Sequence, residues 1–229
     1  MHRRAVWGFF VAAIVGCNRS PTVPGDPTVL RAEALAALKA AHARVEPDEP
    51  TADHPVTAID LTGIEHADEA LAHVARFPTL RTLWLQNTDA TDAGLTKLAG
   101  LAALEKLDLS GTKAGDAGLA RIAHLAGMRA LKLNGTPVTD AGLDSVARLT
   151  SLRVLELAHT AVTDAGLAKL EPLTELEELR LEGTKLTDKG LDGLKSLPKL
   201  TTVYVNGTAA TVRGIDALQR AKPGITVVP

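Results

Sequence analysis

The residue with the most informative side-chain chemistry is Cys17, the single cysteine of this 229-residue chain. One thiol excludes an intrachain disulfide and a zinc site built from several cysteines. Cys17 follows a short positive start, residues 1–4, and an apolar run of eleven residues from Ala5 to Val15. This run is too short to span a bilayer as a helix, which takes about 20 residues. It has the length expected for the hydrophobic part of a secretory signal peptide.

The sequence Ile-Val-Gly-Cys at residues 14–17 resembles the lipobox of bacterial lipoproteins. The resemblance implies cleavage after residue 16, so that residues 1–16 form the signal peptide and Cys17 becomes the first residue. Its thiol, as the nucleophile, would take a diacylglycerol. Because Asn18 stands where an inner-membrane retention signal has Asp, the expected location is the outer membrane of the bacterial cell envelope, facing the periplasm or the exterior. The alternatives are a plain signal peptide, or an N-terminal anchor with an incidental cysteine.

The overall charge argues against several classes of partner. The chain has 25 Lys and Arg residues against 27 Asp and Glu residues. A general nucleic-acid binder would show a basic excess, so no nucleic-acid partner is expected. Removal of residues 1–16 takes away two arginines and leaves no polybasic patch for anionic lipids. Membrane attachment would therefore depend on the acyl chains carried by Cys17.

Three short segments separate Cys17 from the main body of the sequence. Residues 17–27 are rich in proline and are expected to form a flexible tether. Residues 28–55 are expected to hold a capping helix and a connector: Asp26-Pro27 is typical of a helix start, helical spacing of apolar residues extends from Val29 to Val45, and residues 46–55 are acidic and proline-rich. The alternative for the helix, binding to a membrane, is less favoured because repeat proteins need terminal caps.

Residues 56–223 contain a 24-residue unit repeated seven times without an insertion. Positions 1, 4, 6, 11, 16, 19 and 22 of the unit are apolar, with His66 as the single exception. Positions 4 and 6 alternate as in a strand, whereas positions 16 and 19 have helical spacing. A Thr-Asp pair just before that helix predicts an N-cap. Position 15 is glycine in six repeats, which indicates close approach to a neighbouring coil.

This pattern resembles leucine-rich repeats, in particular a subclass that reads L-x-x-L-x-L-x-x-T-x-(V/I)-T-D-x-G-L-x-x-L. The resemblance implies an α/β fold: a right-handed, horseshoe-shaped solenoid with short parallel strands on the concave face and helices on the convex face. Residues 224–229 are expected to add a C-terminal capping strand, and the chain is expected to be a monomer. Position 9 is Thr where better-known subclasses have Asn or Cys. Its hydroxyl is predicted to donate to a neighbouring carbonyl, in a polar ladder along the stack.

The concave face, formed by positions 3, 5, 7 and 8 of each repeat, is the predicted binding face. Position 5 supplies Asp60, two aromatic residues, and a run of four charged residues that alternate in sign from Asp108 to Arg180. Exposed Trp, Tyr and Arg are typical anchors of protein interfaces, whereas the charges could also simply pair with one another. The predicted partner-binding residues are Trp84, Asp108, Lys132, Glu156, Arg180 and Tyr204.

No catalytic set, cofactor site or metal site is predicted. Glu69 and His73, with His66 and Asp68 nearby, are better explained by a solvated helix face, since nothing else fixes a ligand geometry. The aspartates at position 13 are expected at helix starts, where the helix dipole favours them without an ion. The sequence thus predicts a non-enzymatic, lipid-anchored envelope protein that binds a protein partner. A structural component without a ligand, or binding to glycan or peptidoglycan, are the alternatives.

Overall fold

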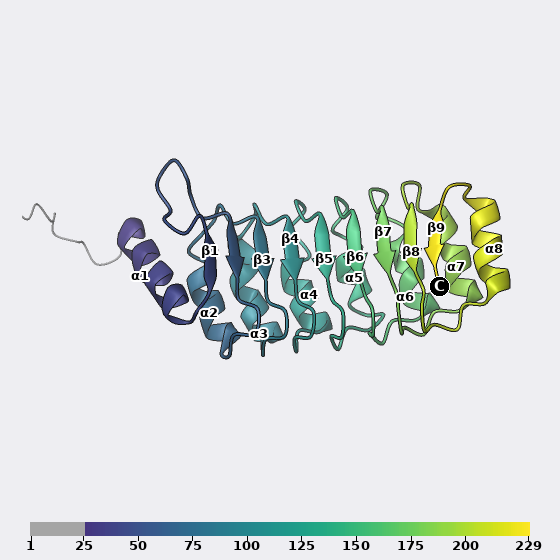
Figure 1. Cartoon of the computed structure of the whole chain (residues 1–229), viewed down its shortest axis with the longest axis horizontal. Helices are drawn as coiled ribbons and strands as arrows, with labels where there is room; N and C mark the ends of the chain where they lie inside the picture. The colour runs from purple at the N-terminus through teal and green to yellow at the C-terminus, as the bar shows by residue number, and fades with distance from the viewer. Residues whose placement is uncertain (1–25) are drawn as a thin grey trace, which may run out of the picture.

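The computed structural model describes residues 26–229, so Cys17, the predicted signal peptide and nearly all of the predicted tether lie outside the described residues. The strands of the described part form one open sheet of nine strands in chain order. They lie side by side along one face of an elongated stack, with the helices behind them (Figure 1). Within residues 26–229, no helix has the length and apolar character needed to cross a membrane.

The strands are three residues long, and each coil returns through a short helix or turn. The strands are β1 (Arg44–Glu46), β2 (Ala58–Asp60), β3 (Thr82–Trp84), β4 (Lys106–Asp108), β5 (Ala130–Lys132), β6 (Val154–Glu156), β7 (Glu178–Arg180), β8 (Thr202–Tyr204) and β9 (Thr226–Val228). The helices are α1 (Pro27–Ala40), α2 (Ala67–Val74), α3 (Asp92–Leu95), η1 (Thr96–Gly100), α4 (Asp116–Ile122), α5 (Leu143–Val146), α6 (Asp164–Leu167), η2 (Ala168–Leu170), α7 (Asp188–Gly193), η3 (Leu194–Ser196) and α8 (Val212–Ala221).

The sheet advances by one 24-residue period per strand. Ala58 is paired with Thr82, Thr82 with Lys106, and the same step continues to the pair of Thr202 and Thr226. All pairs from β2 to β9 are parallel. The register therefore confirms the predicted α/β solenoid of parallel strands and helices. It also places residues with the same position in the repeat next to one another on neighbouring strands.

The core is the continuous column of apolar residues that the repeat pattern predicts. The apolar positions 1, 4, 6, 11, 16, 19 and 22 are buried throughout the middle of the stack. The first repeat departs at His66, which is exposed while its neighbour Ala67 is buried instead. The last repeat departs at Ala210 and Ile215, which are only partly buried, and at Ala221, which is exposed. The packing thus loosens only at the two ends.

The N-terminal end differs from the sequence prediction of a helix that continues to Val45. Helix α1 ends at Ala40, and His42 has a left-handed backbone with φ 63° that reverses the chain. The following strand β1 is antiparallel to β2, with the buried Val45 opposite Ile59. The helical spacing of Val45 was therefore coincidental, because its burial comes from the sheet. Strand β1 closes this end of the solenoid.

Neighbouring coils are joined by an aspartate at position 13 that reaches into the next coil. The carboxylate of Asp164 accepts hydrogen bonds from the backbone N–H of Thr187 at 2.9 Å and from its hydroxyl at 2.6 Å. Thr187 in turn caps helix α7 by accepting a bond from the N–H of Lys189 at 3.2 Å. The same aspartate contact joins the pairs Asp68–Thr91, Asp92–Gly115, Asp116–Thr139, Asp140–Thr163 and Asp188–Thr211.

The aspartate at position 13 is the first residue of α3, α4, α6 and α7, as predicted, whereas Asp140 precedes α5. The N-cap of α3, α6 and α7 is the threonine before the aspartate. The carboxylates of the aspartates are used between coils rather than within their own helix. At Asp188, the hydrogen bonds from the backbone N–H and then the hydroxyl of Thr211 hold the pKa of the carboxyl below its ordinary value. The ionised carboxylate is therefore the form that this contact favours.

The glycine at position 15 leaves the space that this carboxylate occupies. A Cβ on Gly118 would lie 2.6 Å from Oδ1 of Asp92 and 2.8 Å from Cδ1 of Leu95. The other five position-15 glycines face the aspartate of the preceding coil in the same way, namely Gly94, Gly142, Gly166, Gly190 and Gly214. The close approach predicted from the recurring glycine is confirmed, and its cause is a side chain of the neighbouring coil.

The turn after each strand agrees with the sequence prediction in part. As predicted, the threonine hydroxyl at position 9 donates to a neighbouring carbonyl, as Thr88 does to Leu85 at 2.8 Å, but that carbonyl belongs to the same coil, so these bonds do not join one coil to the next. Position 8, which the sequence analysis assigned to the concave face, has a positive φ in every repeat. Glycine fills it in five repeats, whereas Asn87 and His159 adopt it with φ 54° and 57°. Position 8 is thus a turn that ends the strand, and three of its residues, His159, Gly183 and Gly207, still line a cleft on the predicted face beside Tyr204.

We expect Gly118→Ala to destabilise the fold, because its methyl group would collide with Asp92. The intrinsic helix preference of alanine is worth about 1 kcal/mol, but overpacking of this kind costs about 1–3 kcal/mol. The free energy of unfolding, measured by urea denaturation, should therefore fall. Gly193→Ala is the matched control, because open space surrounds that helical glycine, and it should keep or raise the stability. Equal effects of the two substitutions would contradict the account.

Candidate binding face on the sheet

The six predicted partner-binding residues lie in one row on the concave face. The register places Trp84 beside Asp108, Asp108 beside Lys132, and so on through Glu156 and Arg180 to Tyr204. Asp60 extends the row on the other side of Trp84. Neighbouring members are about 4.8 Å apart, the spacing of paired strands. The repeat pattern was thus sufficient to predict which residues share this row.

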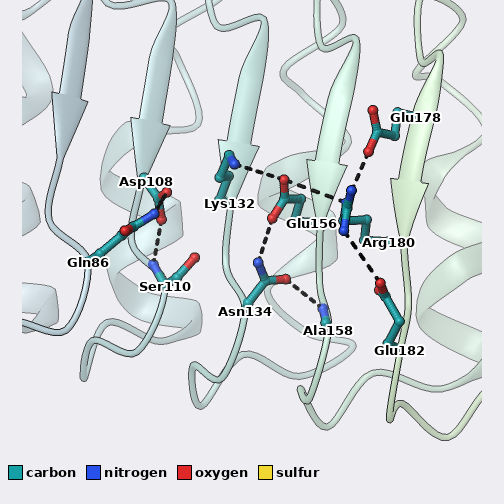
Figure 2. Close-up of polar contacts among 10 residues, drawn as sticks. All are labelled: Gln86, Asp108, Ser110, Lys132, Asn134, Glu156, Ala158, Glu178, Arg180 and Glu182. Carbon is teal, nitrogen blue, oxygen red and sulfur yellow. Dashed lines mark hydrogen bonds and ion pairs between the residues drawn. The ribbon is translucent and has the colours of Figure 1, made fainter. Parts of the chain in front are cut away.

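Asp108 does not take part in the predicted ladder of alternating charges. Only 4% of this residue is exposed. Its carboxylate accepts a hydrogen bond from the side-chain amide of Gln86 and another, at 3.0 Å, from the backbone N–H of Ser110 (Figure 2). Among the ion pairs of residues 26–229, none joins Asp108 to Lys132. The carboxylate of Asp108 is therefore hydrogen-bonded within the protein and is not exposed to a partner. This corrects the sequence prediction, which counted Asp108 among the contact residues.

Glu156 is the centre of the polar network in the middle of the face. Its side chain is 10% exposed, with Nζ of Lys132 at 3.0 Å and Nε of Arg180 at 3.8 Å from Oε1. Its other oxygen accepts a hydrogen bond of 2.5 Å from Asn134, whose own amide oxygen accepts from the N–H of Ala158 at 2.9 Å (Figure 2). Glu156 thus holds Lys132, Arg180 and Asn134 in place, and little of its own side chain is exposed to a partner.

Arg180 is held by carboxylates on both sides and by an aromatic ring. Its Nε donates to Oε1 of Glu178 at 3.0 Å, and its Nη1 lies 3.6 Å from Oε1 of Glu182. The guanidinium carbon lies 4.1 Å from the centre of the Tyr204 ring. Burial alone would lower the pKa of Arg180, but the bond to Glu178 and the charge of Glu156 raise it above its ordinary value. The cation is therefore fixed in place.

The two aromatic residues of the row each line a cleft at opposite ends of the face. Trp84 is half-buried and lines a cleft of about 330 Å³ with Asp60, Gln86 and two residues of β1, Arg44 and Glu46. Tyr204 lines the other cleft, of about 390 Å³, whose remaining lining residues are Ala158, His159, Glu182, Gly183, Asn206, Gly207, Val228 and Pro229. The solvent-accessible aromatic surface is therefore concentrated near the two ends of the face.

Positions 3 and 7 were predicted to lie on the concave face, but none of their residues was among the predicted contacts. Glu178 lies at position 3, and Gln86, Asn134 and Glu182 lie at position 7. The available signal was the strand alternation itself, because positions 3, 5 and 7 point the same way. Arg44 belongs to β1, which the sequence pattern presented as helix, so its place beside Trp84 could not be predicted.

The surroundings of Glu69 and His73 do not form a metal centre in the described part of the chain. Both oxygens of the nearby Asp68 accept hydrogen bonds from Thr91, at 2.9 Å and 2.5 Å. Within residues 26–229, no three side chains of the metal-binding types are gathered at one point. Asp68 therefore serves the contact between coils.

Comparisons with known proteins support the fold. The family model described as Leucine Rich repeat matches residues 148–170. The solved structure of internalin C2 from Listeria monocytogenes is similar with a TM-score of 0.53, at 24% identity, covering 76% of this chain and 77% of that one. An internalin, inlF, from the same species gives a TM-score of 0.43 at 19% identity, covering 69% of this chain and 56% of that one. No curated protein sequence matches the chain.

The class of the protein follows from the repeat, the sheet and these comparisons. Its described part is a leucine-rich repeat solenoid with an open parallel sheet. Stacked repeats of this kind form extended surfaces.

We expect Glu156→Gln to destabilise the fold by about 1–3 kcal/mol, because two cations and Asn134 lose a charged acceptor that is shielded from water. Glu177→Gln is the matched control. Glu177 pairs with Arg153 at 2.9 Å, but its side chain is 40% exposed, so its loss should cost only about 0–1 kcal/mol. Urea denaturation gives both free energies of unfolding. A Glu156 effect no larger than that of Glu177 would contradict the role of Glu156 in the network.

Proposed function

We propose that this chain is a non-enzymatic, lipid-anchored leucine-rich repeat protein of the bacterial cell envelope that binds a protein partner through its concave face. The fold supports the general part of the proposal, because stacked repeats create extended surfaces suited to other proteins. The lipobox resemblance at Cys17 supports the anchor and the location in the outer membrane. A monomer on a flexible tether would leave the face free to meet its partner.

The observation that carries the binding proposal is the half-buried Trp84, which lines a cleft on the concave face. Tyr204 lies five strand steps away in the same row, a separation of about 24 Å at about 4.8 Å per step. A standard protein interface buries about 800 Å² on each partner, so one partner can reach both aromatic residues. A small ligand would fill only one of the clefts.

The network on the face refines which residues would meet the partner. Asp108 and Glu156 are buried and hydrogen-bonded to neighbouring residues, so we assign them the role of holding the surrounding side chains in position. Lys132 and Arg180 have side chains 39% and 35% exposed. The proposed contact residues are therefore Trp84, Lys132, Arg180 and Tyr204.

The binding proposal is tested by capture of partners from an extract of the source cell envelope. We expect Trp84→Ala and Tyr204→Ala each to reduce capture of a stoichiometric partner by tenfold or more, as truncation of aromatic interface anchors does. Lys97→Ala, on the exposed surface of η1, is the control and should leave capture unchanged. If the wild-type chain captures no stoichiometric partner, a structural role without a ligand replaces the proposal. Capture of peptidoglycan or another glycan would identify the other alternative.

The anchor is tested by the intact mass of the protein purified from membranes. We expect a chain that begins at Cys17 and carries the added mass of a diacylglycerol and an N-linked acyl chain. The thiol sulfur must form the thioether bond, so Cys17→Ser should prevent this modification and release the protein from the membrane fraction. An unmodified chain that begins at Met1 would overturn both the anchor and the proposed location.

A further inference from the structure

The two aromatic residues of the concave face differ in what lies over them. At Tyr204, the guanidinium of Arg180 lies 4.1 Å from the ring centre. Around that cation lie Glu156, Glu178 and Glu182, each within 4 Å of it. This end of the face therefore holds an aromatic ring, several carboxylates and an arginine supplied by the chain itself.

The Trp84 end also has an aromatic ring with carboxylates around it, but no cation of the described residues lies over the ring. Asp60 and Asp108 flank Trp84 in register on the neighbouring strands, and Glu46 lines the same cleft. Among residues 26–229, Arg180 over Tyr204 is the only cation placed over an aromatic ring. The cleft beside Trp84 thus has the negative surroundings of the Tyr204 site and about 330 Å³ of open space.

The two carboxylates that flank Trp84 differ in their hydrogen bonds: Asp108 is fully hydrogen-bonded within the protein, whereas Asp60 has a free oxygen. Both oxygens of the buried Asp108 accept hydrogen bonds, so its charge acts on the cleft without direct contact. Asp60 is partly exposed, and only its Oδ1 accepts a hydrogen bond, from the N–H of Thr62 at 2.9 Å. Among the ion pairs of the described residues, none includes Asp60 or Glu46. Oδ2 of Asp60 is therefore available to a ligand.

One positive residue, Arg44, lines the cleft and must be weighed against a cationic ligand. Arg44 is opposite Asp60 in the register of β1 and β2, and it is exposed. Two carboxylates in the lining, Asp60 and Glu46, oppose this one cation. Beyond the lining, β4 carries both the buried Asp108 and the exposed Lys106, whose charges offset each other. The cleft therefore keeps a negative excess, although Arg44 reduces it.

We propose that the Trp84 cleft binds an arginine or lysine side chain of the protein partner. The cation would lie against the face of the indole ring, where the ring quadrupole attracts it, with its N–H groups directed to Asp60. Arginine fits better than lysine, because its planar group can stack on the ring and donate two parallel bonds to a carboxylate. The inference rests on the proposed function, since it names the chemistry of the partner at one end of the same face.

Fluorescence of Trp84 gives a direct test. The sequence has two tryptophans, so the full-length chain carrying Trp7→Phe reports on Trp84 alone. It is titrated at low salt with a capped tri-arginine peptide and with the matched tri-citrulline peptide, which has a similar shape without the charges. We expect a saturable fluorescence change with tri-arginine and at least about fivefold weaker binding of tri-citrulline, in line with a cation on an aromatic ring.

Variants at the two ends of the face locate the site. Asp60→Asn should weaken tri-arginine binding about threefold to fivefold, as expected for the loss of one partly exposed charge contact. Arg44→Gln should strengthen binding, because it removes the competing positive charge. Glu182→Gln, at the Tyr204 end, is the control and should leave the Trp84 titration unchanged.

Three results would overturn the inference: no binding of tri-arginine, equal binding of tri-citrulline, or no effect of Asp60→Asn. Capture of the envelope partner separates this failure from failure of the proposed function. If capture still requires Trp84 while the cation preference is absent, the binding face stands and only the chemistry of its partner is wrong. If capture does not depend on Trp84 or Tyr204, the proposed face itself fails.

Discussion

The contact between an aspartate of one coil and the threonine and glycine of the next is the constraint on which this structure depends. The carboxylate at position 13 occupies the space left by the glycine of the following coil, and in five of the six contacts it receives two hydrogen bonds from that coil, as Asp140 does from Thr163. Asp92 receives one, from Gly115. Apolar packing alone would tolerate small slips between coils, because it is not directional. The hydrogen bonds are directional, so they fix each coil at one period from its neighbour.

This fixed step determines what the concave face can do. Because every coil advances equally, position 5 forms one straight row from Asp60 to Tyr204. The middle of the row is stabilised internally by the network around Glu156 (Figure 2). The two aromatic residues lie beyond this network on either side, next to open clefts. The charges at the centre of the face are therefore largely paired with one another, and its two ends differ: Arg180 lies over the ring of Tyr204, whereas no cation of the described residues lies over the ring of Trp84.

Much of the fold was predictable because the same residue pattern recurs in six or seven of the seven repeats. Leu155 and Leu157 predict the strand, Leu167 and Leu170 the helix, and Gly166 the close approach of coils, and the structure agrees at each point. The errors come from residues whose role depends on neighbours in space. Val45 has helical spacing yet lies in a strand, and Asp108 matched a charge pattern yet bonds to Gln86. The row itself was predictable from the repeat. The hydrogen bonds and ion pairs of its side chains were not, because they depend on where the side chains at positions 3 and 7 lie.

The most direct test of the contact between coils is residue-resolved hydrogen exchange of the native protein by NMR. The backbone N–H of Thr91, Thr139, Thr163, Thr187 and Thr211 donates to an aspartate of the preceding coil. If these bonds set the register, the central amides, Thr139 and Thr163, should exchange as slowly as an amide between strands, such as that of Leu133, which donates to the carbonyl of Glu156 at 2.8 Å. Exchange at the rate of unprotected loop amides would contradict the account.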